Sequence, residues 1–395
     1  MSRTYIEFAE RVKKIPKYIF VEIEDLLREK KKQRETLISL SIGDPDLPPP
    51  QFVLDSLIKE AMDPRNHKYP TSEGNPEFRE AVANWYKGRF GVSLNPETEV
   101  SALIGSKEGL SNVIRAFINP GDRVLIPDPS YPVYAHGGGT LCDGISVFVP
   151  LYERNEFRPD LSTTDSEGAR MMVLNYPNNP TGATVDRVFL REAVEFALRN
   201  DLILVYDNAY SEITFDGYTA PSILEIEGAM DVAVEFNSCS KTFNMTGDRI
   251  GFAMGNEKII EGLKKVKSQI DTGAPIFIQR AAIVALESYR NGRPPRPVEI
   301  TRQTYKERRD ILVKRLREMG FNPKTPKGTF YVWVNLGCES MEFTKRMIDS
   351  GVVVTPGAAF GKHSRSYVRF ALTRPKSEIE KACDRIEKAL EKVQN

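Results

Sequence analysis

Histidine and cysteine are scarce in this chain. Its 395 residues include only 3 histidines and 4 cysteines, and neither an H-E-x-x-H nor a C-x-x-C motif occurs. Without such motifs a zinc enzyme is disfavoured, and a chain of this size rarely depends on disulfides. We therefore expect a globular protein that needs no structural metal.

Long apolar runs and an excess of one charge are also missing. No stretch approaches the roughly 18 apolar residues of a membrane-spanning helix. The N-terminal sequence MSRTYIEFAERVKK has no apolar core of a secretory signal. Lys and Arg total 55 against 54 Asp and Glu, a balance that disfavours a dedicated nucleic-acid binder. We expect a cytoplasmic protein without membrane or nucleic-acid partners.

Apolar segments alternate with segments of helical periodicity between residues 51 and 290. Several of the apolar segments, such as 202–206, are apolar throughout, as is typical of strands covered on both faces. The alternation predicts an α/β fold with a mostly parallel sheet. The predicted strands are 100–104, 122–126, 145–150, 170–174, 202–206, 231–236 and 250–254, and the predicted helices are 51–62, 76–89, 107–118, 186–199 and 257–268.

The pattern changes on both sides of this region. The segments LPPP (47–50) and GRPPRP (292–297) interrupt helices and strands. After the second, helices predicted at 298–319 and 376–393 enclose strands predicted at 330–335, 352–354 and 366–371. We predict an N-terminal arm that forms part of the small domain (1–47), a large domain (48–290) and a small C-terminal α+β domain (291–395). The charged run 28–34 is interpreted as the solvated end of a helix.

The most specific motif is SCSKTFNMTGDRIG, residues 238–251, which follows the strand predicted at 231–236. Lys241 can form a Schiff base with an aldehyde, and Ser238, Ser240 and Arg249 can hold a phosphate dianion. Pyridoxal phosphate carries both groups. A surface loop with an ordinary lysine would explain S-x-S-K alone, but not the extension to Arg249 and the glycine at its end.

This motif resembles the lysine signature of the class I and II aminotransferases, pyridoxal-phosphate enzymes of fold type I. The similarity extends from about residue 18 to 373. It implies a large domain with a mostly parallel sheet and a small α+β domain. It also implies ping-pong transfer of an amino group between an amino acid and a 2-oxo acid, with the 2-oxoglutarate/glutamate pair as one side. A homodimer with shared active sites is expected.

Further expected site residues follow strand ends, where ligands bind in open α/β sheets. The resemblance implies that Asn179 binds the phenolic oxygen of the cofactor and helps to hold the substrate carboxylate. It implies that Asp207 keeps the pyridine nitrogen protonated, that Tyr210 donates to the phenolic oxygen, and that Tyr131 stacks on the ring. The nearby Tyr134 is interpreted as packing.

The remaining expectations concern the phosphate and the substrate. Ser106 and Lys107 open a helix whose N–H groups suit a phosphate, and Lys107 is also a candidate for substrate contact. The resemblance implies that Tyr69 reaches the phosphate of the partner subunit and that the backbone of Gly43 meets the substrate. Arg369, in the middle of a predicted strand, would bind the substrate α-carboxylate; a structural salt bridge is the alternative. Segment 328–331 is interpreted as packing.

The substrate is indicated by weaker features. Tyr18, in YIFVEI, resembles the Y-L-F-x-E-I start of LL-diaminopimelate aminotransferases of lysine biosynthesis, and Lys107 fits their lysine. Ser72 stands where those enzymes carry a glutamate, although Glu73 is next to it, and Thr272 stands where they carry an asparagine. That D-T-G sequence is closer to aminotransferases acting on alanine or aspartate. The diaminopimelate interpretation is preferred, an aspartate/alanine-type or broad-specificity aminotransferase is the alternative, and a lyase of the same fold is the third possibility.

Overall fold

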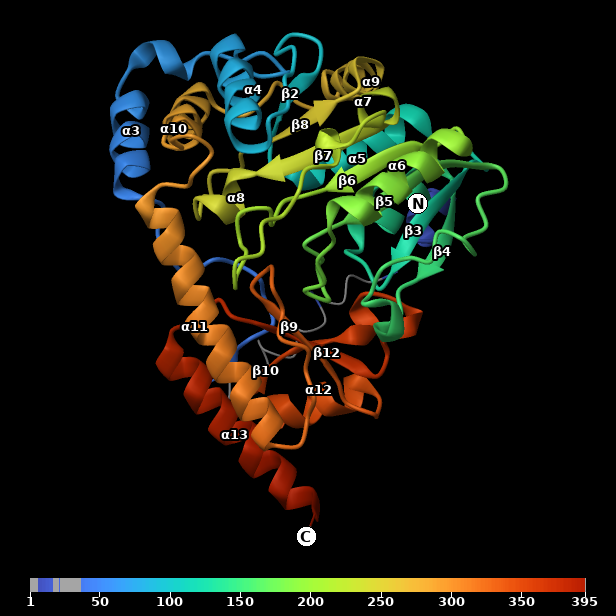
Figure 1. Ribbon diagram of the computed structural model, residues 1–395, viewed down its shortest axis with the longest axis vertical. Helices are drawn as coiled ribbons and strands as arrows, with labels where there is room; N and C mark the ends of the chain where they lie inside the picture. Colours follow the sequence, from blue (N-terminus) through green and yellow to red (C-terminus); the bar gives the residue numbers. More distant parts are fainter. Residues whose placement is uncertain (1–5, 17–20, 22–36, 395) are drawn as a thin grey trace, which may run out of the picture.

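The computed structural model describes residues 6–16, 21 and 37–394. The charged run 28–34 and Tyr18 lie outside the described residues. The described chain forms an upper body and a lower lobe, and the long helix α11 (Arg296–Glu318) runs from one to the other along one side (Figure 1).

The upper body is built on a sheet of seven strands in the order β2-β8-β7-β6-β5-β3-β4. The strands β7, β6, β5, β3 and β4 are parallel, and β8 lies antiparallel between β2 and β7. Each predicted strand segment forms one of these strands, so the predicted α/β class with a mostly parallel sheet is confirmed. The bounds are β2 (Val100–Leu103), β3 (Arg123–Asp128), β4 (Ile145–Pro150), β5 (Ala169–Asn175), β6 (Ile203–Asp207), β7 (Ala233–Ser238) and β8 (Gly251–Gly255).

Helices cover both faces of this sheet. Neighbouring strand residues point to opposite faces, so that Leu204 joins one apolar core and Val205 the other. This explains why the central strands are apolar throughout rather than alternating. One core includes residues of α4 (Pro76–Phe90), α6 (Arg187–Arg199) and α10 (Ile276–Glu287), with α3 (Gln51–Ala61) packed outside α10, and the other includes residues of α5 (Ser106–Phe117) and α9 (Glu257–Lys267).

The lower lobe combines helices with two small sheets. The strand order β11-β12-β9 is antiparallel, and β1 pairs with β10 in parallel. That pairing joins residues 38–39 to residues 352–353, as expected if the N-terminal arm is part of the small domain; the boundaries at 47 and 290 stay a prediction. The bounds are β1 (Ile38–Ser39), β9 (Tyr331–Asn335), α12 (Ser340–Asp349), β10 (Val352–Val353), β11 (Thr355–Pro356), β12 (Tyr367–Ala371) and α13 (Lys376–Gln394).

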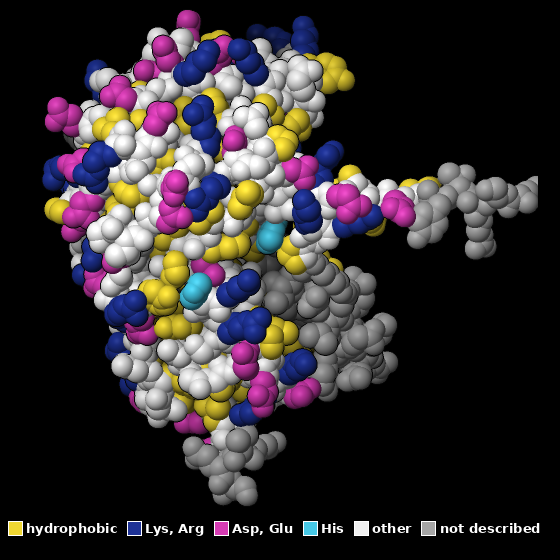
Figure 2. All heavy atoms as spheres, turned by 90° about the vertical axis from the view of Figure 1, so that its right-hand side faces the viewer, with side chains coloured by type: hydrophobic (Ala, Val, Ile, Leu, Met, Phe, Trp, Pro, Cys, Tyr) yellow, Lys and Arg dark blue, Asp and Glu magenta, His cyan; other side chains and the backbone are white. Residues whose placement is uncertain are grey.

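The surface carries charges of both signs side by side. Figure 2 shows one face on which Lys and Arg side chains are interspersed with Asp and Glu rather than gathered by sign. Within the part of the chain that the structure describes, no helix is both long enough and apolar enough to cross a membrane.

Four neighbouring parallel strands end in polar residues at the same edge of the sheet. These residues are Asp128 of β3, Asn175 of β5, Asp207 of β6 and Ser238 of β7. The carboxyl edge of an open α/β sheet is where ligands bind, and here it faces the lower lobe (Figure 1). The polar strand ends therefore lie at the boundary between the upper body and the lower lobe.

A buried glutamate fixes the chain just beyond β6. The carboxylate of Glu235 accepts hydrogen bonds from Asn208 Nδ2 at 2.8 Å, Tyr86 Oη at 2.8 Å and Ser222 Oγ at 2.5 Å. Burial raises the pKa of Glu235 to about 7, although these donors lower it. Because Asn208 directly follows Asp207, the network holds the backbone at the point where that carboxylate leaves the sheet.

Candidate active site

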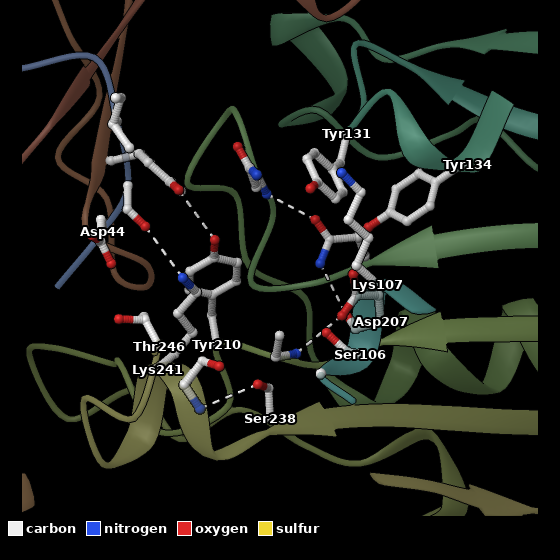
Figure 3. Close-up of a pocket in the computed structure, with 18 of the residues that line it drawn as sticks. Asp44, Ser106, Lys107, Tyr131, Tyr134, Asp207, Tyr210, Ser238, Lys241 and Thr246 are labelled. Carbon is white, nitrogen blue, oxygen red and sulfur yellow. Dashed lines mark hydrogen bonds between the residues drawn. The ribbon is translucent and has the colours of Figure 1, made fainter. Parts of the chain in front are cut away.

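A cavity of about 440 Å³ lies at this edge of the sheet, between it and the lower lobe. Figure 3 shows Lys241, Asp207, Tyr134 and Ser106 around it, supplied by different strands and loops. The structure thus brings together most residues that the sequence indicated. Those that line the cavity are Gly43, Ser106, Lys107, Tyr131, Asn179, Asp207, Tyr210, Ser238, Ser240, Lys241, Arg249 and Arg369.

Two expected site residues lie outside the cavity of this chain. Tyr69 is 88% exposed and Thr272 is also exposed. The two loops that carry them touch, because a methyl group on Gly273 would lie 2.4 Å from the carbonyl oxygen of Thr71. Tyr69 was expected to serve the partner subunit, and Thr272 stands where LL-diaminopimelate aminotransferases carry an asparagine; this exposed position leaves both roles as predictions.

The carboxylate of Glu73 is engaged within its own chain. It lies 3.0 Å from Lys264 Nζ and 3.6 Å from Arg79 Nη2. Its side chain is about one-third exposed. A contact between Glu73 and the substrate of a neighbouring subunit would have to share the carboxylate with these cations.

Lys241 lies in the short helix α8 (Cys239–Thr242), directly after β7. Its Nζ donates to the carbonyl oxygen of Gly43 at 3.2 Å. Burial lowers the pKa of Lys241 to about 8; the carboxylates of Asp44 and Asp207 oppose this shift, and the positive charges of two nearby arginines add to it. At pH 7 roughly a tenth of such an amine is neutral, far more than of an ordinary lysine, and the neutral form is the nucleophile and proton acceptor.

Asp207 is held by donors at the base of the cavity. The side chain is 6% exposed, and it accepts hydrogen bonds from Tyr134 Oη at 2.7 Å and from the backbone N–H of Ala209 at 3.2 Å. Burial raises the pKa of Asp207 to about 6, and the hydrogen bond from Tyr134 opposes the rise. The interpretation of Tyr134 as packing was therefore incomplete: its ring is buried in the core, but its hydroxyl binds the carboxylate.

Arg369 lies on β12 and reaches the cavity from the lower lobe. Its Nη1 donates to Asn179 Oδ1 and its Nη2 to the carbonyl oxygen of Ser41, both at 2.7 Å. The guanidinium also lies 4.1 Å from the centre of the Tyr331 ring. These two hydrogen bonds fix the guanidinium beside the cavity, which it lines. Binding of a substrate carboxylate stays the prediction for Arg369, with a structural salt bridge as the alternative.

Tyr331 contributes more to the cavity than the expected packing. Its hydroxyl lies 3.2 Å from that of Tyr210. A methyl group on Gly43 would lie 1.8 Å from Tyr331 Oη, so only glycine fits there and the backbone of Gly43 can approach the cavity closely.

The groups predicted to bind a phosphate gather where β7, β8 and α5 meet. Ser238 at the end of β7 pairs with Gly251 at the start of β8, and a side chain on Gly251 would lie 2.9 Å from the backbone nitrogen of Ser106. The guanidinium of Arg249 lies so close to Gly105 that a methyl group there would be 2.3 Å from Nη2. Hydroxyls, a guanidinium and the N-terminus of α5 thus share one corner of the cavity.

Several lining residues were given no role from the sequence: Asp44, Asn175 and Thr246. Asn175 connects two strand ends, because its Nδ2 donates to the carbonyl oxygen of Asp207 and its Oδ1 accepts from the backbone N–H of Asn179, each at 2.8 Å. Its position as the polar last residue of an apolar strand is a signal that could have identified it.

Comparison with known proteins places this geometry in a family. Residues 35–386 match the family described as aminotransferase class I and II. The chain belongs to the class I and II aminotransferases. The predicted resemblance is thereby confirmed, and this chain is a transaminase.

Similar proteins are found over nearly the whole aminotransferase chain. It is 46% identical to LL-diaminopimelate aminotransferase of Moorella thermoacetica, over 98% of this chain and 99% of the relative. The corresponding enzyme of Aquifex aeolicus is 44% identical, over 96% and 98%. Among solved structures, substrate-bound BacF from Bacillus subtilis is similar with a TM-score of 0.91 and 36% identity, covering 97% of this chain and 98% of that chain.

Membership of this family implies pyridoxal phosphate as cofactor, and the residues fit it. Lys241 offers an amine whose pKa burial has lowered to about 8. Asp207 offers a buried carboxylate for a ring nitrogen, and the corner beside Arg249 and the start of α5 offers donors for a phosphate. The amine, the carboxylate and the phosphate donors line one cavity, as one ligand carrying all three complementary groups requires.

We expect Asp207→Asn to stabilise the cofactor-free aminotransferase at pH 8. The pKa of Asp207 rises from 3.8 to about 6 on folding, so ionisation favours the unfolded chain, and stability is lost as the pH rises through about 6. Removing the charge should raise the free energy of unfolding by about 1–3 kcal/mol at pH 8, with a smaller gain at pH 5. Urea unfolding at both pH values measures this. An equal effect at the two values would contradict it.

Proposed function

We propose that this aminotransferase moves the amino group between LL-diaminopimelate and the 2-oxoglutarate/glutamate pair in lysine biosynthesis, with pyridoxal phosphate attached to Lys241. The observation that carries the reaction type is the single cavity that holds the Lys241 amine, the buried Asp207 carboxylate and the Arg369 guanidinium. The substrate is supported by relatives named LL-diaminopimelate aminotransferase, which are 43–46% identical over nearly the full chain.

Bound pyridoxal phosphate supplies an electron sink that stabilises negative charge at the substrate α-carbon. Lys241 would hold the cofactor through its Nζ, and once released by the substrate amine this Nζ, in its neutral form, would accept the α-proton as general base and return it as general acid. Asp207, ionised above about pH 6, keeps the ring nitrogen protonated. The hydrogen bond from Tyr134 favours that ionised form.

Other side chains orient the reactants. Because Asn179 Oδ1 accepts from Arg369, the amide nitrogen of Asn179 is the donor for the phenolic oxygen, together with the hydroxyl of Tyr210. Tyr131 lies beside the ring and excludes water. Ser106, Lys107, Ser238, Ser240 and Arg249 hold the phosphate.

Arg369 and Gly43 bind the α-carboxylate end of the substrate. LL-diaminopimelate and glutamate each carry a second carboxylate at the distal end, for which Lys107 and Tyr18 are the candidates. We also propose a cytoplasmic homodimer in which Tyr69 and Thr272 of each subunit complete the site of the other. The D-T-G sequence at 271–273 keeps an aspartate/alanine-type or broad-specificity enzyme as the alternative; a lyase is the less favoured reading.

We expect Lys241→Ala to bind pyridoxal phosphate without a covalent link and to lose transamination by roughly 10²–10⁴-fold or more, because the nucleophile and the proton carrier vanish together. The absorption of the cofactor after gel filtration and denaturation measures attachment, and coupled assays measure turnover. Turnover near the wild-type rate would end the assignment of Lys241.

LL-diaminopimelate should convert the bound cofactor faster than L-alanine or L-aspartate, by on the order of 10²-fold, because its distal ammonium and carboxylate add charged hydrogen bonds. Half-reactions with single amino acids measure this. If alanine or aspartate reacts at least as fast, the aspartate/alanine-type or broad-specificity enzyme replaces the diaminopimelate interpretation.

If the Glu73 carboxylate contacts the distal ammonium of LL-diaminopimelate, Glu73→Gln should slow the half-reaction with LL-diaminopimelate more than those with L-alanine and L-aspartate. Lys264→Met is the matched control for this substitution, because it removes the ion pair with Glu73 but keeps the carboxylate. A loss of selectivity in both variants would show that Glu73 acts only through its own chain.

Tyr69→Phe and Lys241→Ala should complement each other in a mixed dimer. If Tyr69 serves the neighbouring subunit, one hybrid site is intact and the other carries both defects. After confirmed subunit exchange, the mixture should be more active than the sum of the two homodimers. Activity no greater than that sum would refute the shared site.

A further inference from the structure

A carboxylate of the upper body is enclosed by a loop of the lower lobe. Asp128, the last residue of β3, is 2% exposed. It accepts hydrogen bonds from the backbone N–H of Lys362 at 3.1 Å and of His363 at 3.4 Å, and its Oδ2 lies 2.9 Å from His363 Nδ1. These donors come from the loop that leads into β12, the strand of Arg369.

The loop is shaped to this carboxylate. Gly361 has a φ of +151°, a conformation that favours glycine. A methyl group there would lie 1.7 Å from Asp128 Oδ1, so any side chain would displace the carboxylate. A second connection lies beside it, because the backbone N–H of Ser130 donates to the carbonyl oxygen of Phe360 at 2.9 Å.

Both ends of this connection continue into the active site. Ser130 precedes Tyr131, which lines the cavity. On the other side, the ring of Phe360 lies 4.7 Å from Arg369 Cζ. Asp128 itself is absent from the described residues that line the catalytic cavity. It therefore contacts no reactant, but it connects the segment that carries Tyr131 with the segment that supports Arg369.

We propose that Asp128 is a positioning residue, which fastens the loop 360–363 to the end of β3 and so keeps Arg369 where the reaction needs it. The proposal rests on the proposed role of Arg369 in binding the α-carboxylate. Its consequence is a defect specific to substrates with an α-carboxylate, since the cofactor contacts of Lys241 and Asp207 come from other strands.

The test compares Asp128→Ala, Asp128→Asn and Gly361→Ala in the cofactor-loaded enzyme. A displacement of about 1 Å can cost on the order of 10²-fold, so Asp128→Ala should raise KM for L-glutamate by roughly 10- to 100-fold with a smaller change in kcat. Asp128→Asn, which keeps one acceptor oxygen, should show a smaller rise. Gly361→Ala changes the loop instead of the carboxylate and should raise KM for L-glutamate in the same way.

Two further measurements separate positioning from general damage. The reaction of n-butylamine with the cofactor needs no carboxylate grip, so its rate and the absorption spectrum of the bound cofactor should stay at wild-type values. Glu153→Gln is the matched control, because Glu153 accepts a hydrogen bond from Tyr367 of β12 at 3.1 Å but does not hold the loop 360–363. It should leave KM for L-glutamate unchanged.

Each outcome decides. An unchanged KM in Asp128→Ala or, should that variant not fold, in Asp128→Asn overturns the proposal. Equal losses with L-glutamate and n-butylamine also overturn it, because Asp128 would then be structural only. Arg369→Ala serves as the reference: if it leaves KM for L-glutamate unchanged, the proposed function of Arg369 fails, whereas an effect of Arg369→Ala without one of Asp128→Ala refutes the positioning role alone.

Discussion

A carboxylate at the end of a buried strand must be solvated by the protein itself, since water is largely excluded. Asp207 is in this position, and the surrounding residues are arranged to meet its needs. Tyr134 and the backbone N–H of Ala209 donate to it, Asn175 binds its carbonyl oxygen, and burial still raises its pKa to about 6. Burying this carboxylate costs stability in the folded chain, and the proposed role of Asp207, keeping a ring nitrogen protonated, would require that cost.

The cavity depends on segments that are far apart in the chain. Asp207 and Ser238 end strands of the upper sheet, whereas Arg369 and Tyr331 belong to β12 and β9 of the lower lobe. The hydrogen bond of Arg369 with Asn179, and those of Asp128 with the loop before β12, connect the two sides.

Electrostatics at the site combine fixed charges with neutral donors and acceptors. Arg369 is oriented beside the cavity by an amide oxygen and a carbonyl oxygen. Lys241 lies among groups of both signs, and burial decides the direction of its pKa shift. Another buried acid, Glu235, lies among four donors, where it supports the backbone rather than the reaction.

The sequence by itself determined the local features. Apolar runs of strand length predicted each strand of the large sheet, and motifs with a fixed spacing indicated Lys241 and Asp207, because these signals lie within a few neighbouring residues. The helix α10 was missed because its sequence IFIQRAAIVALE is apolar on most sides, and periodicity cannot separate such a run from a buried strand.

Only the tertiary structure decided which distant groups meet. Tyr134 and Asp207 are 73 positions apart, and Asp128 and His363 are 235 apart. The antiparallel insertion of β8 between β2 and β7, and the ion pairs that engage Glu73, likewise have no local signature. Such contacts depend on the order in which strands and loops pack, and no period along the chain records that order.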